Sequence, residues 1–409
     1  MKNIISFALC LVLVLSVFSA CKGGEDKSDI KYDPILDGYS EVNVDAFPEC
    51  VTDLGLKLIT KADNGKSNVL VSPLSAYFAL AMVSEGASGE TLSELEVPLG
   101  MENNNVTAAI SLYLKEILSE ERENTLSIAN ALWLRSGKDG AKPTSRFIDI
   151  MERNYMATVF RSPMNSDTVY KMNSWVKEKT SNRIKKVIEK TDPEAYAYIV
   201  NAISFDSKWE EQYKVTDVRD GIFTDSEGRE QKVKFMSSTE KDYIETDLGI
   251  GFKKAYEGER YSFIAIMPKE EYSISELLAS LDSETLCRVI RESNGQSVMT
   301  MLPKFTVNGE LDLAKSLKEL GVNKAFEMGD GFSELSPNGQ MCLSRIIHKT
   351  YIKVHEEGTE AGAVTVIEAP DSAYGDEPKT VYLDRPFVYG IVDVESGIPV
   401  LLGTMNHVE

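Results

Sequence analysis

One stretch near the C-terminus, residues 356–366, most constrains what this chain can fold into. It reads Glu-Glu-Gly-Thr-Glu-Ala-Gly-Ala-Val-Thr-Val and follows a strand-like run at residues 348–355. Because side chains alternate along a strand, His348 and every second residue as far as Val354 share one face of that run. Gly358 then permits a reversal of the backbone. The pattern therefore predicts a strand, a turn and a second extended segment.

Small side chains occupy one face of this second segment. Thr359, Ala361 and Ala363 share that face, whereas the carboxylates of Glu360 and Glu368 lie on the other. A ribbon of this kind could slide into a narrow slot in a β-sheet without presenting a bulky or charged group to it. The alternative interpretation is an exposed linker, rich in Ala and Gly, between two strands.

Residues 356–365 resemble the hinge of the exposed loop of inhibitory serpins, and other segments resemble the same family. One such motif is weakly specific, but several in the family's order and at its spacing are strongly specific. The other segments are Asn68-Val69-Leu70-Val71-Ser72-Pro73-Leu74-Ser75, residues 200–210 with Lys208-Trp209-Glu210, Leu302-Pro303-Lys304-Phe305, Asp384-Arg385-Pro386-Phe387 and Pro399-Val400-Leu401-Leu402-Gly403.

The resemblance covers residues 46–409 and implies one serpin domain there. It implies an α+β fold in which eight or nine helices surround three β-sheets and a reactive-centre loop is exposed. The length of 409 residues would by itself suggest two or three domains. No internal repeat and no Pro- or Ser-rich linker divides the chain, however. The resemblance therefore outweighs the length and favours a single domain.

Hydrophobic periodicity agrees with the α+β class, because helices come mostly first and strands mostly last. Apolar residues recur at helical spacing over 46–61, and Ser72 before Pro73 favours the start of a second helix. Further helices are predicted at 91–95, 108–118, 167–188, 275–291 and 311–320, and buried strands at 126–134 and 261–267.

The N-terminus predicts export. Residues 1–20 combine Lys2 with an apolar run that is shorter than the ~20 residues needed to span a bilayer, as in a signal peptide. Ser19-Ala20-Cys21 resembles a bacterial lipoprotein processing site, which would lipidate Cys21 and anchor the protein at the cell envelope or surface. Ordinary signal cleavage and secretion is the alternative. Residues 21–45 are polar and acidic, and are expected to form a tether.

Three cysteines remain in the expected domain, namely Cys50, Cys287 and Cys342. They are too few and too scattered for a disulfide framework. All three lie in segments that are predicted to be structured, so we expect buried thiols, with one disulfide pair as the alternative.

Charge and motif content exclude several function classes. The formal net charge of −20 opposes binding to phosphate backbones, so no nucleic-acid partner is expected. The sequence has no Gly-x-Ser-x-Gly elbow, zinc helix, Cys-x-x-Cys pair or phosphate loop, so no enzyme activity, metal or cofactor is expected. Its three histidines are His348, His355 and His407, and His348 on the apolar face of its strand is interpreted as a core histidine.

The family resemblance refines that interpretation for four polar residues. Ser72, Ser75, Asn201 and His348 match residues that hydrogen-bond beneath the opening sheet of serpins, and we refer to them as the gate. Their implied role is to close the sheet reversibly, whereas the alternative is ordinary hydrogen bonding in the core.

Three further residues match the point where the serpin loop first inserts. These are Trp209, Lys304 and Glu356, and we refer to them as the insertion site. Trp209 could instead be an ordinary core residue with no role in insertion. The alternative for Lys304 and Glu356 is a surface ion pair that contributes little stability.

The resemblance also implies a reactive bond, because serpin inhibitors are cut at a characteristic distance after the first hinge glutamate. Counted from Glu356, that distance implies the bond Ser372-Ala373, whose small flanks suit elastase-like or subtilisin-like proteases. Counting back from Pro386 favours Tyr374-Gly375 instead, which suits a chymotrypsin-like protease. The hinge itself comprises Glu356, Glu357, Gly358, Thr359, Glu360, Ala361, Gly362 and Ala363.

The function that the resemblance implies is irreversible inhibition of serine proteases. The protease forms a covalent acyl intermediate at the loop, and the cut loop then inserts into the main sheet and traps it. Papain-like cysteine proteases are a further target class. The inhibitor is expected to be a monomer that meets a membrane only through its lipid anchor. The alternative function is a non-inhibitory serpin that acts as a binding or structural module.

Overall fold

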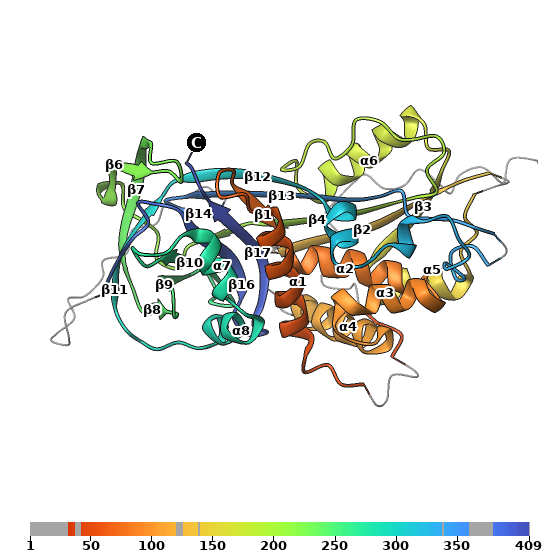
Figure 1. The fold of residues 1–409 in the computed structure, drawn as a ribbon, viewed down its shortest axis with the longest axis horizontal. Helices are drawn as coiled ribbons and strands as arrows, with labels where there is room; N and C mark the ends of the chain where they lie inside the picture. Colours follow the sequence, from red (N-terminus) through yellow and green to blue (C-terminus); the bar gives the residue numbers. More distant parts are fainter. Residues whose placement is uncertain are drawn as a thin grey trace, which may run out of the picture. The chain divides into compact units, whose positions relative to one another are not determined.

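Three β-sheets organise the part of the chain that the structure describes, and nine α-helices accompany them (Figure 1). The structure is a computed structural model, and residues 33–409 form one unit in it. The described residues are 32–36, 42–119, 126–137, 140–337, 339–359 and 379–408. The helices are α1 (Phe47–Ala62), α2 (Pro73–Ser84), α3 (Gly89–Leu99), α4 (Asn103–Ser119), α5 (Ser145–Asn154), α6 (Ser166–Lys179), α7 (Ile274–Ser280), α8 (Ser283–Arg291) and α9 (Leu313–Glu319).

The largest sheet, here called the central sheet, has seven strands and carries the segments that the sequence singled out. Its strand order is β3-β2-β4-β13-β14-β5, and β12 pairs with the other side of β13. The bounds are β3 (Ala157–Ser162), β2 (Leu126–Arg135), β4 (Ala197–Phe205), β13 (Arg345–His355), β14 (Gly358–Thr359), β5 (Ser207–Lys208) and β12 (Phe305–Asp312).

Two antiparallel-rich sheets complete the fold. The six-stranded sheet has the order β1-β17-β16-β10-β9-β8, and the four-stranded sheet has the order β15-β11-β7-β6. Their bounds are β1 (Val69–Val71), β17 (Ile398–Met405), β16 (Phe387–Asp393), β10 (Tyr261–Pro268), β9 (Gly249–Ala255), β8 (Asp242–Glu245), β15 (Lys379–Tyr382), β11 (Val298–Pro303), β7 (Glu230–Glu240) and β6 (Val218–Thr224).

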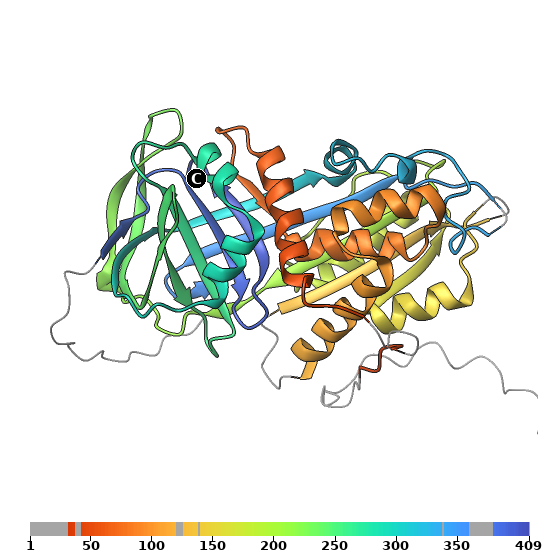
Figure 2. The same ribbon diagram turned by 60° about the horizontal axis from the view of Figure 1, so that its bottom comes forward.

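The central sheet is covered on both faces. Helix α6 lies on one face, where Met172 and Val176 pack against Trp133 of β2 and Ile347 of β13. Helix α2 lies on the opposite side (Figures 1 and 2), and every one of its residues is buried. Because both faces of β4 are covered, all nine residues of that strand are buried.

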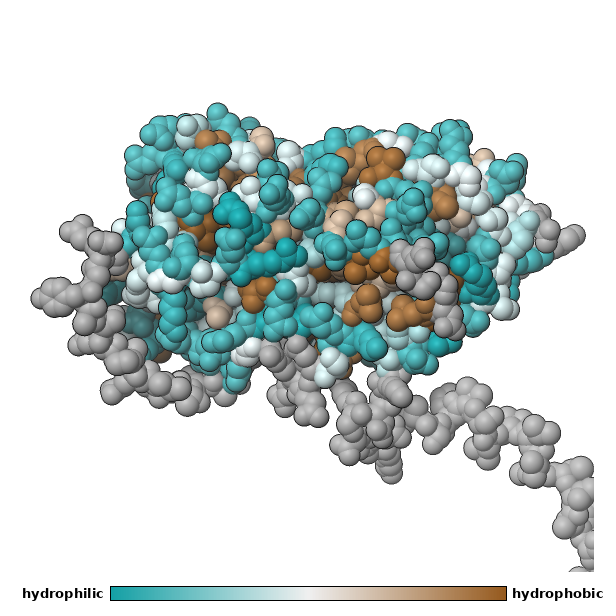
Figure 3. Space-filling model, turned by 90° about the horizontal axis from the view of Figure 1, so that it is seen from below, coloured by the Kyte–Doolittle hydropathy of each residue, from teal (hydrophilic) through white to brown (hydrophobic). Residues whose placement is uncertain are grey.

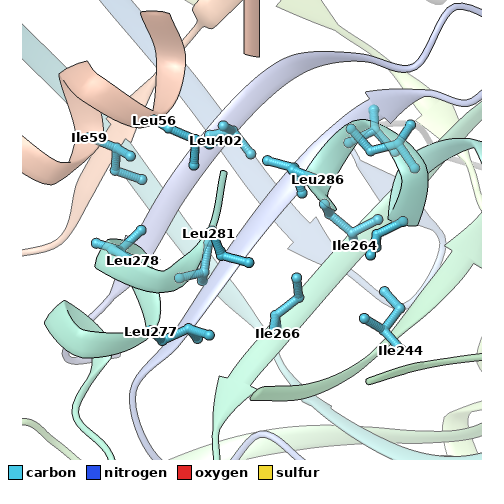
Figure 4. Packing of buried hydrophobic residues seen from close by; sticks show 14 of the residues in the cluster. Leu56, Ile59, Ile244, Ile264, Ile266, Leu277, Leu278, Leu281, Leu286 and Leu402 are labelled. Carbon is cyan, nitrogen blue, oxygen red and sulfur yellow. The ribbon is translucent and has the colours of Figure 1, made fainter. Parts of the chain in front are cut away.

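A second hydrophobic cluster joins α1, α7 and α8 to the six-stranded sheet (Figure 4). Leu56 and Ile59 of α1 meet Leu277 of α7, together with Ile264 and Ile266 of β10. The residues that remain exposed on the face drawn in Figure 3 are mostly hydrophilic, with a few hydrophobic groups between them. Within the described ranges, no helix is both long enough and apolar enough to cross a bilayer.

The predicted elements are confirmed in type, with two corrections. Helix α6 ends at Lys179 rather than continuing to residue 188, because Ser181 and Asn182 adopt left-handed backbone conformations. The side chain of Asn173 then binds the backbone of residues 187–188 and holds that segment against the helix.

The single helix expected at 275–291 is also wrong, because the chain forms α7 and α8 there. Leu281 turns into an extended conformation, and Asp282 accepts a hydrogen bond of 2.7 Å from the backbone N–H of Thr285. This N-cap begins the second helix.

The structure also bears on the predictions for the tether and for the cysteines. Within the expected tether, the backbone of Ile35 exchanges two hydrogen bonds with the side chain of Asn154 at the end of α5. The three cysteines of the domain are unpaired, and Cys287 is buried while Cys50 and Cys342 are half-buried.

Candidate functional site

Strand β13 changes partner along its length, and this change defines the site. Residues Arg345–Lys349 pair in parallel with Tyr198–Ala202 of β4. Further along, Val354 and His355 pair instead with the two residues of β14. Among the described residues, no pairing joins 350–353 to β4. The start of the hinge therefore already forms a strand between β13 and β5, beyond the point where β13 and β4 separate.

Gly358 is required where β14 passes β5. A Cβ atom on this residue would lie 2.2 Å from the backbone oxygen of Ser207 and 2.6 Å from Cα of Lys208. Its φ of +155° is also unfavourable for a residue with a side chain. The predicted alternation is confirmed as far as it is described: His348, Thr350, Ile352 and Val354 are buried, and so is Thr359.

Trp209 and Tyr213 hold the backbone of the hinge from one side. The indole Nε1 of Trp209 donates to the carbonyl of His355 at 2.8 Å, and its backbone N–H donates to Glu357 at 3.0 Å. The backbone N–H of Tyr213 donates to the carbonyl of Glu356 at 3.0 Å. Trp209 is 1% exposed, so it is both a core residue and a contact of the hinge.

The stack of aromatic rings continues to the first residue of the extended segment. Tyr256 lies parallel to Trp209, with the ring centroids 4.5 Å apart. Its hydroxyl is 2.7 Å from Oγ1 of Thr359. The small side chain of Thr359 is therefore buried. The alternation of small residues along this segment predicts that its side chain faces inward.

Lys304 and Glu356 form an ion pair at the hinge. Nζ of Lys304 lies 2.5 Å from Oε2 of Glu356, and both side chains are about one-third exposed (31% and 34%). Burial opposes ionisation of Glu356, but the hydrogen bond and charge of Lys304 outweigh it, so the pKa of Glu356 is lowered. The structure thus brings all three predicted insertion-site residues to the hinge.

The four gate residues are also brought together, in one buried chain of hydrogen bonds. The backbone N–H of Ser72 donates to Nε2 of His348 at 3.0 Å, and Oγ of Ser72 accepts from the N–H of Ser75 at 3.1 Å. Ser75 Oγ donates to Oδ1 of Asn201. Asn201 is the register partner of His348 across β4 and β13. The gate therefore joins the N-terminal end of α2 to the segment where β4 and β13 still pair.

His348 is neutral in this arrangement. Its side chain is buried, and desolvation lowers its pKa from 6.5 to about 4. A nitrogen that accepts a hydrogen bond carries no proton, so the hydrogen of the imidazole resides on Nδ1.

One residue of this chain of hydrogen bonds, Asn130, was not predicted from the sequence. Asn130 of β2 accepts a hydrogen bond from Nδ2 of Asn201, its register partner, and donates one of 2.8 Å to the carbonyl of Tyr155. Asn130 is 2% exposed. The signal for it was available, because it is the only amide side chain in the otherwise mainly apolar strand at 126–134.

Several predicted site residues lie outside the described residues. They are the later hinge residues Glu360, Ala361, Gly362 and Ala363, both candidate reactive bonds Ser372-Ala373 and Tyr374-Gly375, and Cys21.

Comparisons with known proteins agree with this architecture. The profile of the serpin (serine protease inhibitor) family matches residues 49–408. An uncharacterised serpin-like protein of Thermococcus kodakarensis is 28% identical over 92% of this chain and 88% of its own length. Human neuroserpin is 26% identical over 89% and 92%. The native-state crystal structure of the thermophilic serpin tengpin has 36% identity and a TM-score of 0.84, and covers 93% of this chain and 98% of its own.

A three-sheet α+β fold in which the start of the hinge forms a short strand between β13 and β5 is the architecture of the serpin class. This chain belongs to the serpin family, and the predicted fold class is confirmed. The family is one of protease inhibitors rather than catalytic enzymes. Thyroxine-binding globulin, 23% identical with a TM-score of 0.78, shares the fold, so the fold alone does not distinguish inhibition from ligand binding.

Proposed function

We propose that this serpin is an irreversible, single-use inhibitor of serine proteases that traps the acyl-enzyme by inserting its cut loop into the central sheet. Strand β14 is the observation that supports this most directly. Two hinge residues already pair with β13 and β5, and the pairing of β13 with β4 ends at Lys349 and Ala202. The inserted strand can therefore lengthen from β14 between β4 and β13 once the gate residues part.

The reaction uses the chemistry of the protease and the geometry of the inhibitor. The protease serine attacks the carbonyl carbon of Ser372, the bond to Ala373 breaks, and an ester joins the two proteins. An inserted strand of about fifteen residues spans ~50 Å, which carries the attached protease to the far end of the sheet before water hydrolyses the ester. A papain-like protease would form the equivalent thioester.

The small residues at Ser372-Ala373 favour elastase-like and subtilisin-like targets, whereas Tyr374-Gly375 would favour a chymotrypsin-like target. Incubation with elastase, subtilisin, chymotrypsin, trypsin and papain tests the proposal. We expect an adduct that resists SDS with elastase or subtilisin, together with a released C-terminal peptide whose mass shows that it begins at Ala373. A peptide that begins at Gly375 would move the reactive bond.

Cleavage in the loop by all of these proteases, with no adduct, would contradict the trap and favour a non-inhibitory serpin that acts as a binding or structural module. Heating distinguishes the two outcomes independently. An inhibitor that stores free energy gains thermal stability when its loop is cut and inserted, whereas a module gains none.

The inhibitor is further proposed to act outside the cytoplasm, held at a bacterial envelope or surface through a lipid on Cys21. The polar residues after Cys21 would serve as the tether. Cys21→Ala should move the protein from the membrane fraction to the medium. If the unaltered protein is already in the medium, ordinary secretion replaces the lipid anchor.

A further inference from the structure

Lys254 and Glu240 form a buried ion pair beside the insertion site. The side chain of Lys254, on β9, is 2% exposed, and its Nζ lies 2.8 Å from Oε1 of Glu240, whose side chain is 12% exposed. Burying two charges costs desolvation free energy, and a pair of apolar side chains of equal volume is often as stable. The location of this pair therefore calls for an explanation beyond stability.

The ammonium group of Lys254 faces two aromatic rings. Its Nζ is 4.5 Å from the ring centroid of Tyr213 and 5.5 Å from that of Trp209. Both distances are within the range of a cation–π attraction, which strengthens when the cation is removed from water. Glu240 also accepts a hydrogen bond of 2.5 Å from Ser238, so the carboxylate that holds the ammonium is itself fixed.

The same two aromatic residues fix the backbone of the hinge. Together they donate the three hydrogen bonds, described above, to the carbonyls of residues 355–357. Two lysines therefore flank the hinge in different ways. Lys304 binds the side chain of Glu356 directly, whereas Lys254 reaches the hinge through Tyr213 and Trp209, the two residues that bind its backbone.

We infer that Lys254 is a positioning residue for loop insertion. Its attraction to the rings of Tyr213 and Trp209 holds these two residues in the position from which they bind the hinge. This inference rests on the proposed function and deepens it. The strand that grows during insertion starts from β14, and β14 depends on the hinge being held in place. Without the cation, the hinge leaves this position more often, insertion starts later, and water hydrolyses a larger share of the acyl-enzyme.

Two variants separate positioning from simple charge balance. Lys254→Met removes the cation but leaves the charge of Glu240 buried, so we expect both lower thermal stability and slower insertion. Lys254→Met combined with Glu240→Gln removes both charges. We expect this double variant to regain most of the thermal stability while insertion remains slower by about threefold or more, the size of a partly buried cation–π contact.

Lys253→Met is the matched control, because Lys253 is the neighbouring buried lysine of β9. Its Nζ binds the carbonyls of Ile290 and Glu292 at the end of α8 and contacts neither aromatic ring. This variant should lose stability but insert at the wild-type rate.

Insertion is measured in two ways, as the stoichiometry of inhibition with a protease and as the uptake of a synthetic peptide with the sequence of residues 359–372. If the unaltered protein traps no protease, the proposed function fails, and peptide uptake still decides the role of Lys254. If the double variant inserts at the wild-type rate by both measures, Lys254 serves only to neutralise Glu240 and the inference is overturned.

Discussion

Nε2 of His348 accepts a hydrogen bond of 3.0 Å from the backbone N–H of Ser72, and this contact ties strand β13 to the N-cap of helix α2. It exists only while the imidazole is neutral, because a protonated Nε2 cannot accept. The gate is therefore sensitive to pH at one identified atom.

Acidification should weaken the native state through His348. An exposed histidine in the unfolded chain titrates near pH 6.5, whereas burial lowers the pKa of His348 to about 4. The folded state thus binds fewer protons between these values, so its stability is complete above about pH 6.5 and falls as the pH drops toward 4. The loss amounts to ~3 kcal/mol over that interval, and urea unfolding at several pH values measures it.

A His348→Gln variant isolates this contribution, since the carboxylates and His355 titrate in both proteins. Burial also lowers the pKa of His355, so its contribution has the same sign and cancels in the comparison. The variant should show a shallower decline of stability between pH 6.5 and 4 than the wild type. Identical slopes would mean that His348 is not a source of the pH dependence.

Removing Asn130 should loosen the gate without touching the hinge. Asn130→Ala leaves Nδ2 of the buried Asn201 without the partner that the structure shows, which costs about 1–3 kcal/mol. We expect the native protein to convert more rapidly, at raised temperature, to a form that withstands heat and no longer inhibits. Asn173→Ala is the control, because it removes comparable hydrogen bonds at residues 187–188 outside the gate. Equal conversion rates for the two variants would contradict a gate role for Asn130.

Much of this site could be predicted because its residues lie in short motifs that keep their order along the chain. The alternation around His348 correctly predicted which side chains of residues 348–355 are buried. The resemblance of Ser72, Ser75 and Asn201 to serpin residues predicted a set that the structure joins by hydrogen bonds.

The parts that could not be predicted depend on contacts between distant segments. Lys254 follows another lysine in its strand, and such a pair ordinarily indicates a solvated position. Its burial is set by Glu240 and the two rings it meets, which lie on other elements. The early end of α6 has a different, local cause, because Ser181 and Asn182 adopt left-handed conformations that non-glycine residues seldom take.

The ion pair between Lys304 and Glu356 should contribute little to folding stability. Both side chains are about one-third exposed, so water screens the attraction despite the short distance. A double-mutant cycle with Lys304→Gln and Glu356→Gln, followed by urea unfolding, should give a coupling energy below ~1 kcal/mol that shrinks further in high salt. A larger coupling that is insensitive to salt would show that the pair is screened less than its exposure indicates.

Gly358→Ala should expel β14 from its place beside β5. The added methyl group would lie 2.2 Å from the backbone oxygen of Ser207, which cannot rotate away as a side chain could. The variant should be cut by its target protease with little trapping. Gly65→Ala is the control, since φ at Gly65 is +68° but no atom lies within 4 Å of the new Cβ. That substitution should cost only ~1 kcal/mol of stability and leave trapping intact.

The alternation beyond Thr359 predicts opposite results for two neighbouring positions in the hinge. Thr359 is buried against Tyr256, so the residues two and four places later should face the same way when the strand extends. Ala361→Arg would bring a long charged side chain to that inward face and stall insertion, whereas Glu360→Arg would place the same side chain on the outward face. With the same protease, Ala361→Arg should be hydrolysed mainly as a substrate, and Glu360→Arg should retain most of its trapping. The ratio of adduct to cleaved inhibitor on an SDS gel measures the difference, and equal loss at both positions would mean that the inserting segment does not follow this alternation.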